Sequence, residues 1–188
     1  MTRKKPWFMM TVGAALVGLL IITPATASGQ GQGQYKLGGA WTGKEEPAGH
    51  FWISTLAPLD SAAKEATIHT SFVTSSAEMA GLAAKFGADA FSDFVGEARM
   101  MDRTAARWTS VGYAVKRSQL NQPAEVKFIL VLSGTWTFTD SSHAVLQYRV
   151  SIYPAATDAD GDGMPDAGAM PIGVANVTDS ARRVPILQ

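Results

Sequence analysis

Alternation of apolar and polar residues within the segment 143–153, from Leu146 to Ile152, is the feature that most constrains the fold of this chain. Leu146, Tyr148 and Val150 are separated by single polar residues, so an extended segment would have one apolar and one polar face. Segments of this kind recur along the chain. Those predicted as strands are residues 37–44, 50–57, 65–74, 92–101, 107–117, 125–139, 143–153 and 174–184. The chain is therefore predicted to be mainly β.

Most links between these segments are short and polar, which makes chain neighbours into sheet neighbours. Residues 140–142 (Asp-Ser-Ser) suit a tight hairpin. Within residues 125–139 both faces are apolar, and Gly134 is predicted to form a bulge before Trp136 resumes the alternation. We expect an antiparallel meander of about eight strands that closes into a barrel or, alternatively, folds into a two-layer sandwich.

One short helix is predicted after the third strand. Residues 75–78 (Ser-Ser-Ala-Glu) fit a capping box, and Gly87 is placed to end the helix. Apolar residues recur between them at helical spacing, at Met79, Leu82, Ala83 and Phe86. This apolar stripe is expected to close an opening in the sheet.

Residues 1–27 have the three parts of a secretory signal peptide. Residues 3–5 are basic, residues 7–22 are apolar, and the small residues 25–27 form a cleavage site before Ser28. The apolar part is shorter than the roughly 20 residues of a spanning helix. We therefore expect cleavage, no membrane span after processing, and a secreted or periplasmic protein.

The charge and cysteine content narrow the class of the mature protein further. The chain has 16 basic and 16 acidic residues, and removal of the three basic residues in the signal peptide leaves a net charge of −3. This balance excludes a general nucleic-acid binder. The chain has no cysteine, so no disulfide holds its loops. Residues 28–34 form a Gly/Gln-rich flexible leader, and residues 35–188 are predicted to form a single β domain.

The most specific motif is an acidic loop at residues 158–166 (Asp-Ala-Asp-Gly-Asp-Gly-Met-Pro-Asp). Its four carboxylates repel one another, and no Lys or Arg lies between Tyr153 and Ser180 to offset them. Ca²⁺ suits this composition because it takes six to eight oxygen ligands and tolerates irregular geometry. A calcium loop spanning residues 156–170 is therefore predicted, with a solvated loop that binds no ion as the alternative.

The loop resembles the D-x-D-G-D-G-x-x-D calcium loop of EF-hand-like motifs and thrombospondin type 3 repeats. The resemblance implies a Ca²⁺ site with the side chains of Asp158, Asp160, Asp162 and Asp166 and the carbonyl of Met164 as ligands. Position 12, where a bidentate acid is usual, is Ala169, and neither flank resembles a helix. We expect a Kd on the order of 10⁻⁴ to 10⁻³ M, unless Asp179 or Asp140 completes the ligand shell.

Two glycine-x-tryptophan triplets suggest a second resemblance. Gly39-Ala40-Trp41 resembles the G-x-W signature of lipocalin and calycin barrels, and Gly134-Thr135-Trp136 repeats the pattern. The resemblance implies that Trp41 plugs one end of an eight-stranded barrel whose cavity holds a small apolar ligand. The predicted helix and the acidic loop both depart from the calycin arrangement. An ordinary aromatic core explains both tryptophans as well.

No catalytic or cofactor-binding residue is predicted. Ser61 and Lys64 satisfy S-x-x-K, but the K-T-G partner of that pattern is missing. His50, His69 and His143 lack metal-binding spacing. We expect an exported, non-enzymatic β-barrel with one Ca²⁺-stabilised loop and a binding or structural role. The alternatives are a calycin-like carrier of a small apolar ligand and a small hydrolase or isomerase with a pocket in the barrel.

Overall fold

A computed structural model of the chain describes residues 35–46, 51–73, 85–117 and 123–185. The predicted signal peptide and the Gly/Gln-rich leader lie outside these residues, as does the predicted helix up to residue 84. Lys85 and Phe86, at the end of that prediction, are helical. No helix within the described ranges is long and apolar enough to span a membrane.

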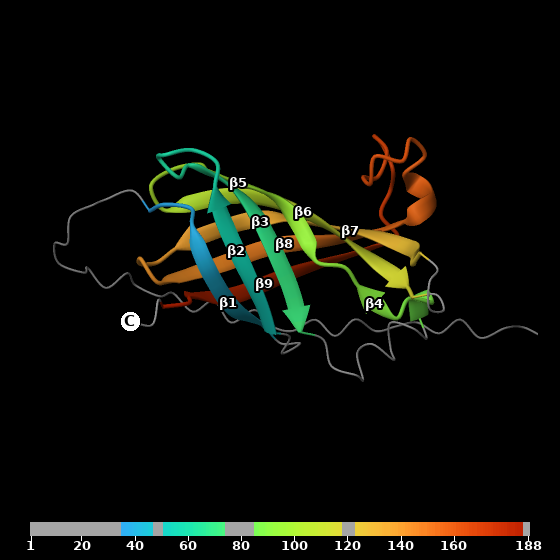
Figure 1. Cartoon of the computed structure of the whole chain (residues 1–188), viewed down its shortest axis with the longest axis horizontal. Helices are drawn as coiled ribbons and strands as arrows, with labels where there is room; N and C mark the ends of the chain where they lie inside the picture. Colours follow the sequence, from blue (N-terminus) through green and yellow to red (C-terminus); the bar gives the residue numbers. More distant parts are fainter. Residues whose placement is uncertain (1–34, 47–50, 74–84, 118–122, 186–188) are drawn as a thin grey trace, which may run out of the picture. The chain divides into compact units, whose positions relative to one another are not determined.

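Eight antiparallel strands form a closed barrel, and a ninth, two-residue strand lies outside it (Figure 1). The strands are β1 (Gly39–Glu46), β2 (Phe51–Pro58), β3 (Glu65–Val73), β4 (Ala90–Phe91), β5 (Phe94–Met100), β6 (Ala105–Lys116), β7 (Glu125–Phe138), β8 (His143–Pro154) and β9 (Gly173–Arg183), with the 3₁₀ turn η1 (Ala155–Thr157) after β8. All eight predicted strands are confirmed, and the short β4 is an addition.

The barrel closes because its last strand pairs with its first. The barrel strands follow one another in the order β1, β2, β3, β5, β6, β7, β8 and β9, and each pairs with the next. In the closing pair, Trp41 lies opposite Arg183 and Gly43 opposite Ala181. Strand β4 pairs with β6 beyond the end of β5, with Ala90 opposite Val115. Of the two predicted architectures, the barrel is therefore confirmed.

Period-two alternation places the core inside the barrel. In β2, Trp52, Ser54 and Leu56 are buried while the residues between them are exposed. The largest fully buried side chains are Trp41, Trp52, Trp136, Leu37, Ile68, Ile129, Asp179 and Ser110. The tryptophans contact one another edge to face, with centroids 5.5 Å apart for Trp41 and Trp136. Aromatic side chains thus fill much of the interior.

The prediction of a bulge at Gly134 is wrong. Gly134 pairs in regular register with Trp108 on β6 and Tyr148 on β8, and the irregularity between β6 and β7 lies instead at Ala114/Val115. A Cβ at Gly134 would lie 2.1 Å from the carbonyl oxygen of Gln147. Gly134 therefore allows β7 and β8 to approach each other closely in the curved wall, and no residue is inserted into the pairing.

The two ends of the barrel differ. Turns 59–64, 101–104 and 139–142 lie at one end, which we call the closed end because residues 35–38 cross it. The N–H of Leu37 donates to the carbonyl of Ala63 at 2.9 Å, and Leu37 is fully buried. The connection between β8 and β9, residues 155–172, lies at the opposite end and contains the acidic loop.

Candidate functional site

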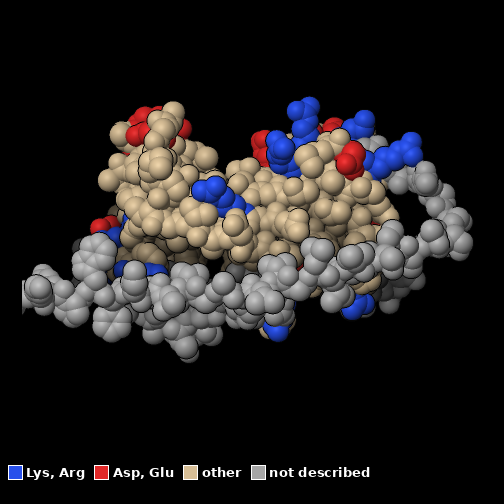
Figure 2. Space-filling model, turned by 180° about the vertical axis from the view of Figure 1, so that it is seen from behind, with Lys and Arg blue, Asp and Glu red and all other residues tan. Residues whose placement is uncertain are grey.

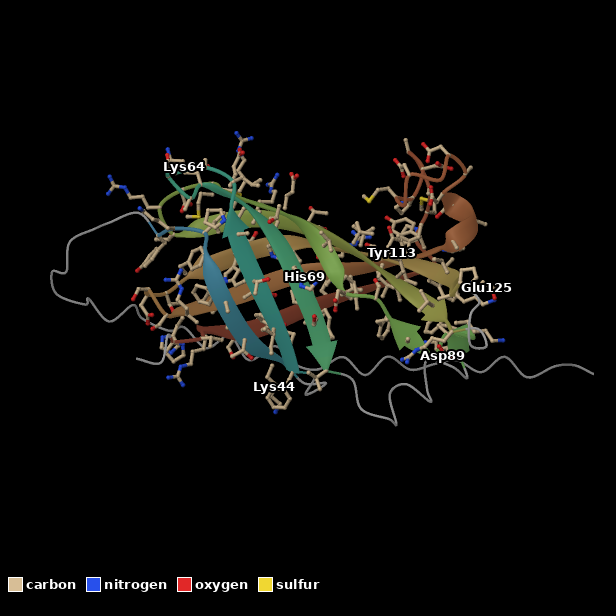
Figure 3. The ribbon with its side chains drawn as sticks, in the orientation of Figure 1. Lys44, Lys64, His69, Asp89, Tyr113 and Glu125 are labelled. Atoms are coloured by element: carbon tan, nitrogen blue, oxygen red, sulfur yellow. The ribbon has the colours of Figure 1, made fainter. Side chains whose placement is uncertain are left out.

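The acidic loop packs on the outside of the barrel wall. It follows β8 directly and projects above β6 and β7 (Figure 1). Tyr113 on β6 reaches up to it, and its hydroxyl donates to the carbonyl of Gly163 at 3.0 Å (Figure 3). Ile129 alternates with core residues of β7 and so points outward, yet it is only 1% exposed. The wall beneath the loop is therefore shielded from water.

Each aspartate of the loop accepts a hydrogen bond from the loop's own backbone. Asp158 accepts from the N–H of Gly163 at 3.1 Å, and Asp160 accepts from the N–H of Asp162 at 3.2 Å. Asp162 accepts from the N–H of Met164 at 2.7 Å, and Asp166 accepts from the N–H of Ala159 at 3.2 Å. Gly161 and Gly163 adopt φ of 75° and 86°, which disfavour other residues. The loop is thus folded around its carboxylates.

Three of the predicted calcium ligands come together. Carboxylate oxygens of Asp158, Asp160 and Asp162 lie within 4.8 Å of one another. The carboxylate of Asp158 also has an oxygen, Oδ1, that is shielded from solvent and has no hydrogen-bond partner in the described part of the chain. Acidic side chains gather at the tip of the projecting loop, with no basic ones among them in the view of Figure 2.

The other two predicted ligands have different surroundings. Asp166 lies outside the group of three, where its N–H donates to the carbonyl of Thr157 at 2.6 Å and closes the base of the loop. Met164 donates its own N–H to Asp162, and its side chain is 39% exposed. Its carbonyl remains a predicted ligand.

Neither distant acid completes the shell. Asp179 points into the barrel, where it is 2% exposed and accepts hydrogen bonds from Trp52 and Tyr148. Asp140 lies in the turn between β7 and β8, at the closed end, and β8 separates it from the loop. The N–H of Ser142, with the Ser142 hydroxyl and His143, lowers the pKa of Asp140 to about 2. Asp140 therefore stabilises its own turn.

The barrel interior is almost filled. A cavity of about 20 Å³ remains at mid-barrel, enough for a single water molecule. It is lined by Trp52, Ser54, Ile68, Thr70, Phe72, Trp108, Leu132, Trp136, Leu146, Tyr148 and Asp179. A lipid-sized ligand in this place would require the aromatic side chains to move.

Trp41 lies at the closed end, where the calycin resemblance places its plug. The indole N–H of Trp41 donates to the carbonyl of Gly38 at 3.2 Å, and the side chain is 1% exposed. The guanidinium of Arg183 lies over the ring, with Cζ 5.1 Å from the centroid. Trp136 is equally buried and packs against Trp41 as an ordinary core residue.

The remaining candidates lie apart from one another. Ser61 and Lys64 are exposed in the turn between β2 and β3. His69 on β3 contacts Asp93 at 3.2 Å, and His143 contacts Asp140 at 2.9 Å. His50 lies outside the described residues. Sequence reasoning missed Tyr113, whose alternation signals only a strand, and the inward orientation of Asp179.

Comparisons with known proteins leave the chain without a family. No family model matches it, and no curated protein matches it. A solved structure described as EF1p2_mFAP2b bound to DFHBI matches with a TM-score of 0.41 and 12% identity, covering 79% of this chain and 94% of that chain. At this level of similarity the match carries no functional information.

Proposed function

We propose that the protein is an exported, non-enzymatic β-barrel in which one Ca²⁺ ion, bound by residues 158–166, fixes the acidic loop to the barrel wall. The observation that carries the proposal is the convergence of three carboxylates within 4.8 Å. The barrel then has a binding or structural role, and the ion does for the loop what a disulfide does in cysteine-containing exported proteins.

The electrostatics of the loop favour a divalent cation. Each pair of carboxylates at this separation repels by about 1 kcal/mol even at the dielectric constant of water. No basic residue between Tyr153 and Ser180 offsets that repulsion. The shielded oxygen of Asp158 needs a positive partner more than the exposed carboxylates of Asp160 and Asp162 do. Calcium supplies that partner without demanding regular geometry.

Thermal denaturation in excess calcium and in excess chelator tests the proposal. With a Kd on the order of 10⁻⁴ to 10⁻³ M, about 10 mM Ca²⁺ should stabilise the protein by about 1.4 to 2.7 kcal/mol. The melting temperature should rise accordingly, and Mg²⁺ should raise it less because it demands octahedral geometry. Coincident melting curves in calcium and chelator would sink the proposal.

Charge-neutral variants locate the site. Asp162→Asn keeps an oxygen for the N–H of Met164 but removes one negative charge, so the calcium-dependent shift should fall while stability in chelator stays nearly constant. Asp166→Asn should reduce the shift less, because Asp166 lies outside the group of three. Glu97→Gln, which removes an exposed acid on β5, is the matched control and should leave the shift unchanged.

Export is tested separately. Expression of the full chain in a bacterial host, followed by mass spectrometry of the purified product, should give a mature N-terminus at Ser28. Recovery of the chain with residues 1–27 attached, from the cytoplasm alone, would contradict export and leave the calcium proposal standing.

The carrier alternative has the closed barrel in its favour and the small interior volume against it. Native mass spectrometry after gentle release separates the two. A calcium adduct alone supports the structural role, whereas a co-purifying apolar molecule of lipid size supports a carrier whose core rearranges.

A further inference from the structure

A second pocket lies at the closed end, far from the acidic loop. It has a volume of about 230 Å³, below the 300–1,000 Å³ of sites for drug-sized ligands. Its lining residues are Tyr35, Lys36, Trp41, Phe138, Ser141 and Arg183. Two are cationic, three are aromatic, two (Tyr35 and Ser141) carry a hydroxyl, and none is acidic. We call it the closed-end pocket.

The two cations are available to a ligand. Neither Lys36 nor Arg183 forms an ion pair with any residue that the structure describes. Arg183 is nonetheless held in place, because Nη2 donates to the carbonyl of Gly38 at 2.7 Å and the guanidinium lies over Trp41. Its backbone N–H also donates to Ser142 in the adjoining turn, at 2.8 Å. A positioned guanidinium without an acidic partner is a preorganised hydrogen-bond donor for an anionic ligand.

The surroundings favour an anion with an apolar body. The rings of Tyr35 and Phe138 stack with centroids 5.7 Å apart and form one wall. Asp140 is next to Ser141 in the chain but does not line the pocket, and it accepts hydrogen bonds from the N–H groups of Ser142 and His143. The only charged side chains that line the pocket among the described residues, those of Lys36 and Arg183, are positive, and apolar walls adjoin them.

We propose that the closed-end pocket binds a small carboxylate, with the negative charge between Lys36 and Arg183 and the apolar part against the aromatic wall. Benzoate, a ring with a single carboxylate, is the probe that matches this chemistry and size. Because the attraction is between charges near solvent, binding should weaken as salt rises. The site is independent of calcium, so it stands or fails separately from the loop.

Titration of the full chain with benzoate tests the proposal, with binding followed by calorimetry and by NMR shifts of the Arg183 and Ser141 amides. We expect saturable binding that persists in chelator. Benzamide, the neutral analogue, should not bind. Lys36→Gln, at an exposed position, should weaken binding about threefold, and Arg183→Lys about tenfold because the planar fork is lost.

The matched control is Arg182→Gln. Arg182 is the neighbouring cation on β9 and is exposed on the opposite face of the strand, so its removal should leave the dissociation constant unchanged. Several results would overturn the assignment: no saturation, equal binding of benzamide, equal weakening by Arg182→Gln and Lys36→Gln, or displacement of benzoate by an equal concentration of inorganic phosphate. Arg183→Lys also alters the hydrogen bond between Arg183 and Gly38. If this variant does not fold, the result for Lys36→Gln, at an exposed position, tests the proposal.

Discussion

Asp179 accepts a hydrogen bond from the indole N–H of Trp52 at 2.9 Å, although 127 residues separate them in the chain. The hydroxyl of Tyr148 donates to the same carboxylate at 3.0 Å. One buried carboxylate thus joins β2, β8 and β9 inside the barrel. A buried polar network of this kind stabilises a fold only while its partners remain satisfied.

Replacing Asp179 tests that network. Asp179→Leu leaves two buried donors without their acceptor, and we expect a loss of about 3 kcal/mol or more in the free energy of unfolding. Asp179→Asn keeps one oxygen and should cost less. Urea unfolding followed by tryptophan fluorescence measures both. Tyr148→Phe, which removes a single donor, should cost about 1 kcal/mol. If Asp179→Leu costs no more than Tyr148→Phe, the carboxylate does not organise the core.

Gly134 is expected to tolerate no side chain. In Gly134→Ala the new Cβ would lie 2.1 Å from a carbonyl oxygen of β8, so the wall must shift and stability should fall by about 2 kcal/mol or more. Gly173→Ala is the control, because its Cβ would meet Ile152 at an ordinary 3.6 Å, and it should stay within about 0.5 kcal/mol of the parent. Chemical denaturation compares the two, and equal losses would contradict the close-approach explanation.

Tyr113 should couple the barrel wall to calcium binding by the acidic loop, if the loop binds calcium as proposed. Tyr113→Phe removes the hydrogen bond to Gly163, which is worth about 1 kcal/mol. Calcium binding must then supply more of the free energy that orders the loop, so the Kd for calcium should rise about fivefold. Calcium titration calorimetry measures the change. Tyr153→Phe is the matched control, because the Tyr153 hydroxyl makes no hydrogen bond to a described residue. An unchanged Kd in Tyr113→Phe would show that the contact does not position the ligands.

Asp140 should make the protein sensitive to acid. Its pKa falls from an ordinary 3.8 to about 2 in the folded chain, so its contribution to stability is complete above pH 4 and is lost as pH falls toward 2. Asp140→Asn should therefore be less stable than the parent at neutral pH, and the gap should narrow between pH 4 and 2. Unfolding curves at several pH values measure this, and a gap that is constant with pH would contradict it.

The strands were predictable because the information is local. Alternation along β8 and β2 requires only that one face be apolar, and the structure has those faces inside the barrel. Closure into a barrel could not be predicted from the sequence pattern. It depends on the pairing of Trp41 with Arg183, and neither position has a local sequence feature that indicates its partner. Gly134 shows the same limit, since bulges and close approaches are both made by glycine.

The acidic loop was predictable in composition but not in placement. The spacing of Asp158, Asp160 and Asp162 predicted that their carboxylates converge, and they do. The role of Asp166 at the base of the loop depends on backbone hydrogen bonds that the spacing leaves open. The contact with Tyr113 depends on which strands lie beneath, and so on the whole topology.

The pairing of β1 with β9 also determines when the barrel can exist. A chain that stops before β9 keeps two unpaired strand edges, each with free N–H and C=O groups able to add a strand from another molecule. We infer that truncated or newly made chains are prone to self-association until the final strand docks. Protection of the strand edges against pairing with other molecules is therefore complete only after β9 has paired with β1.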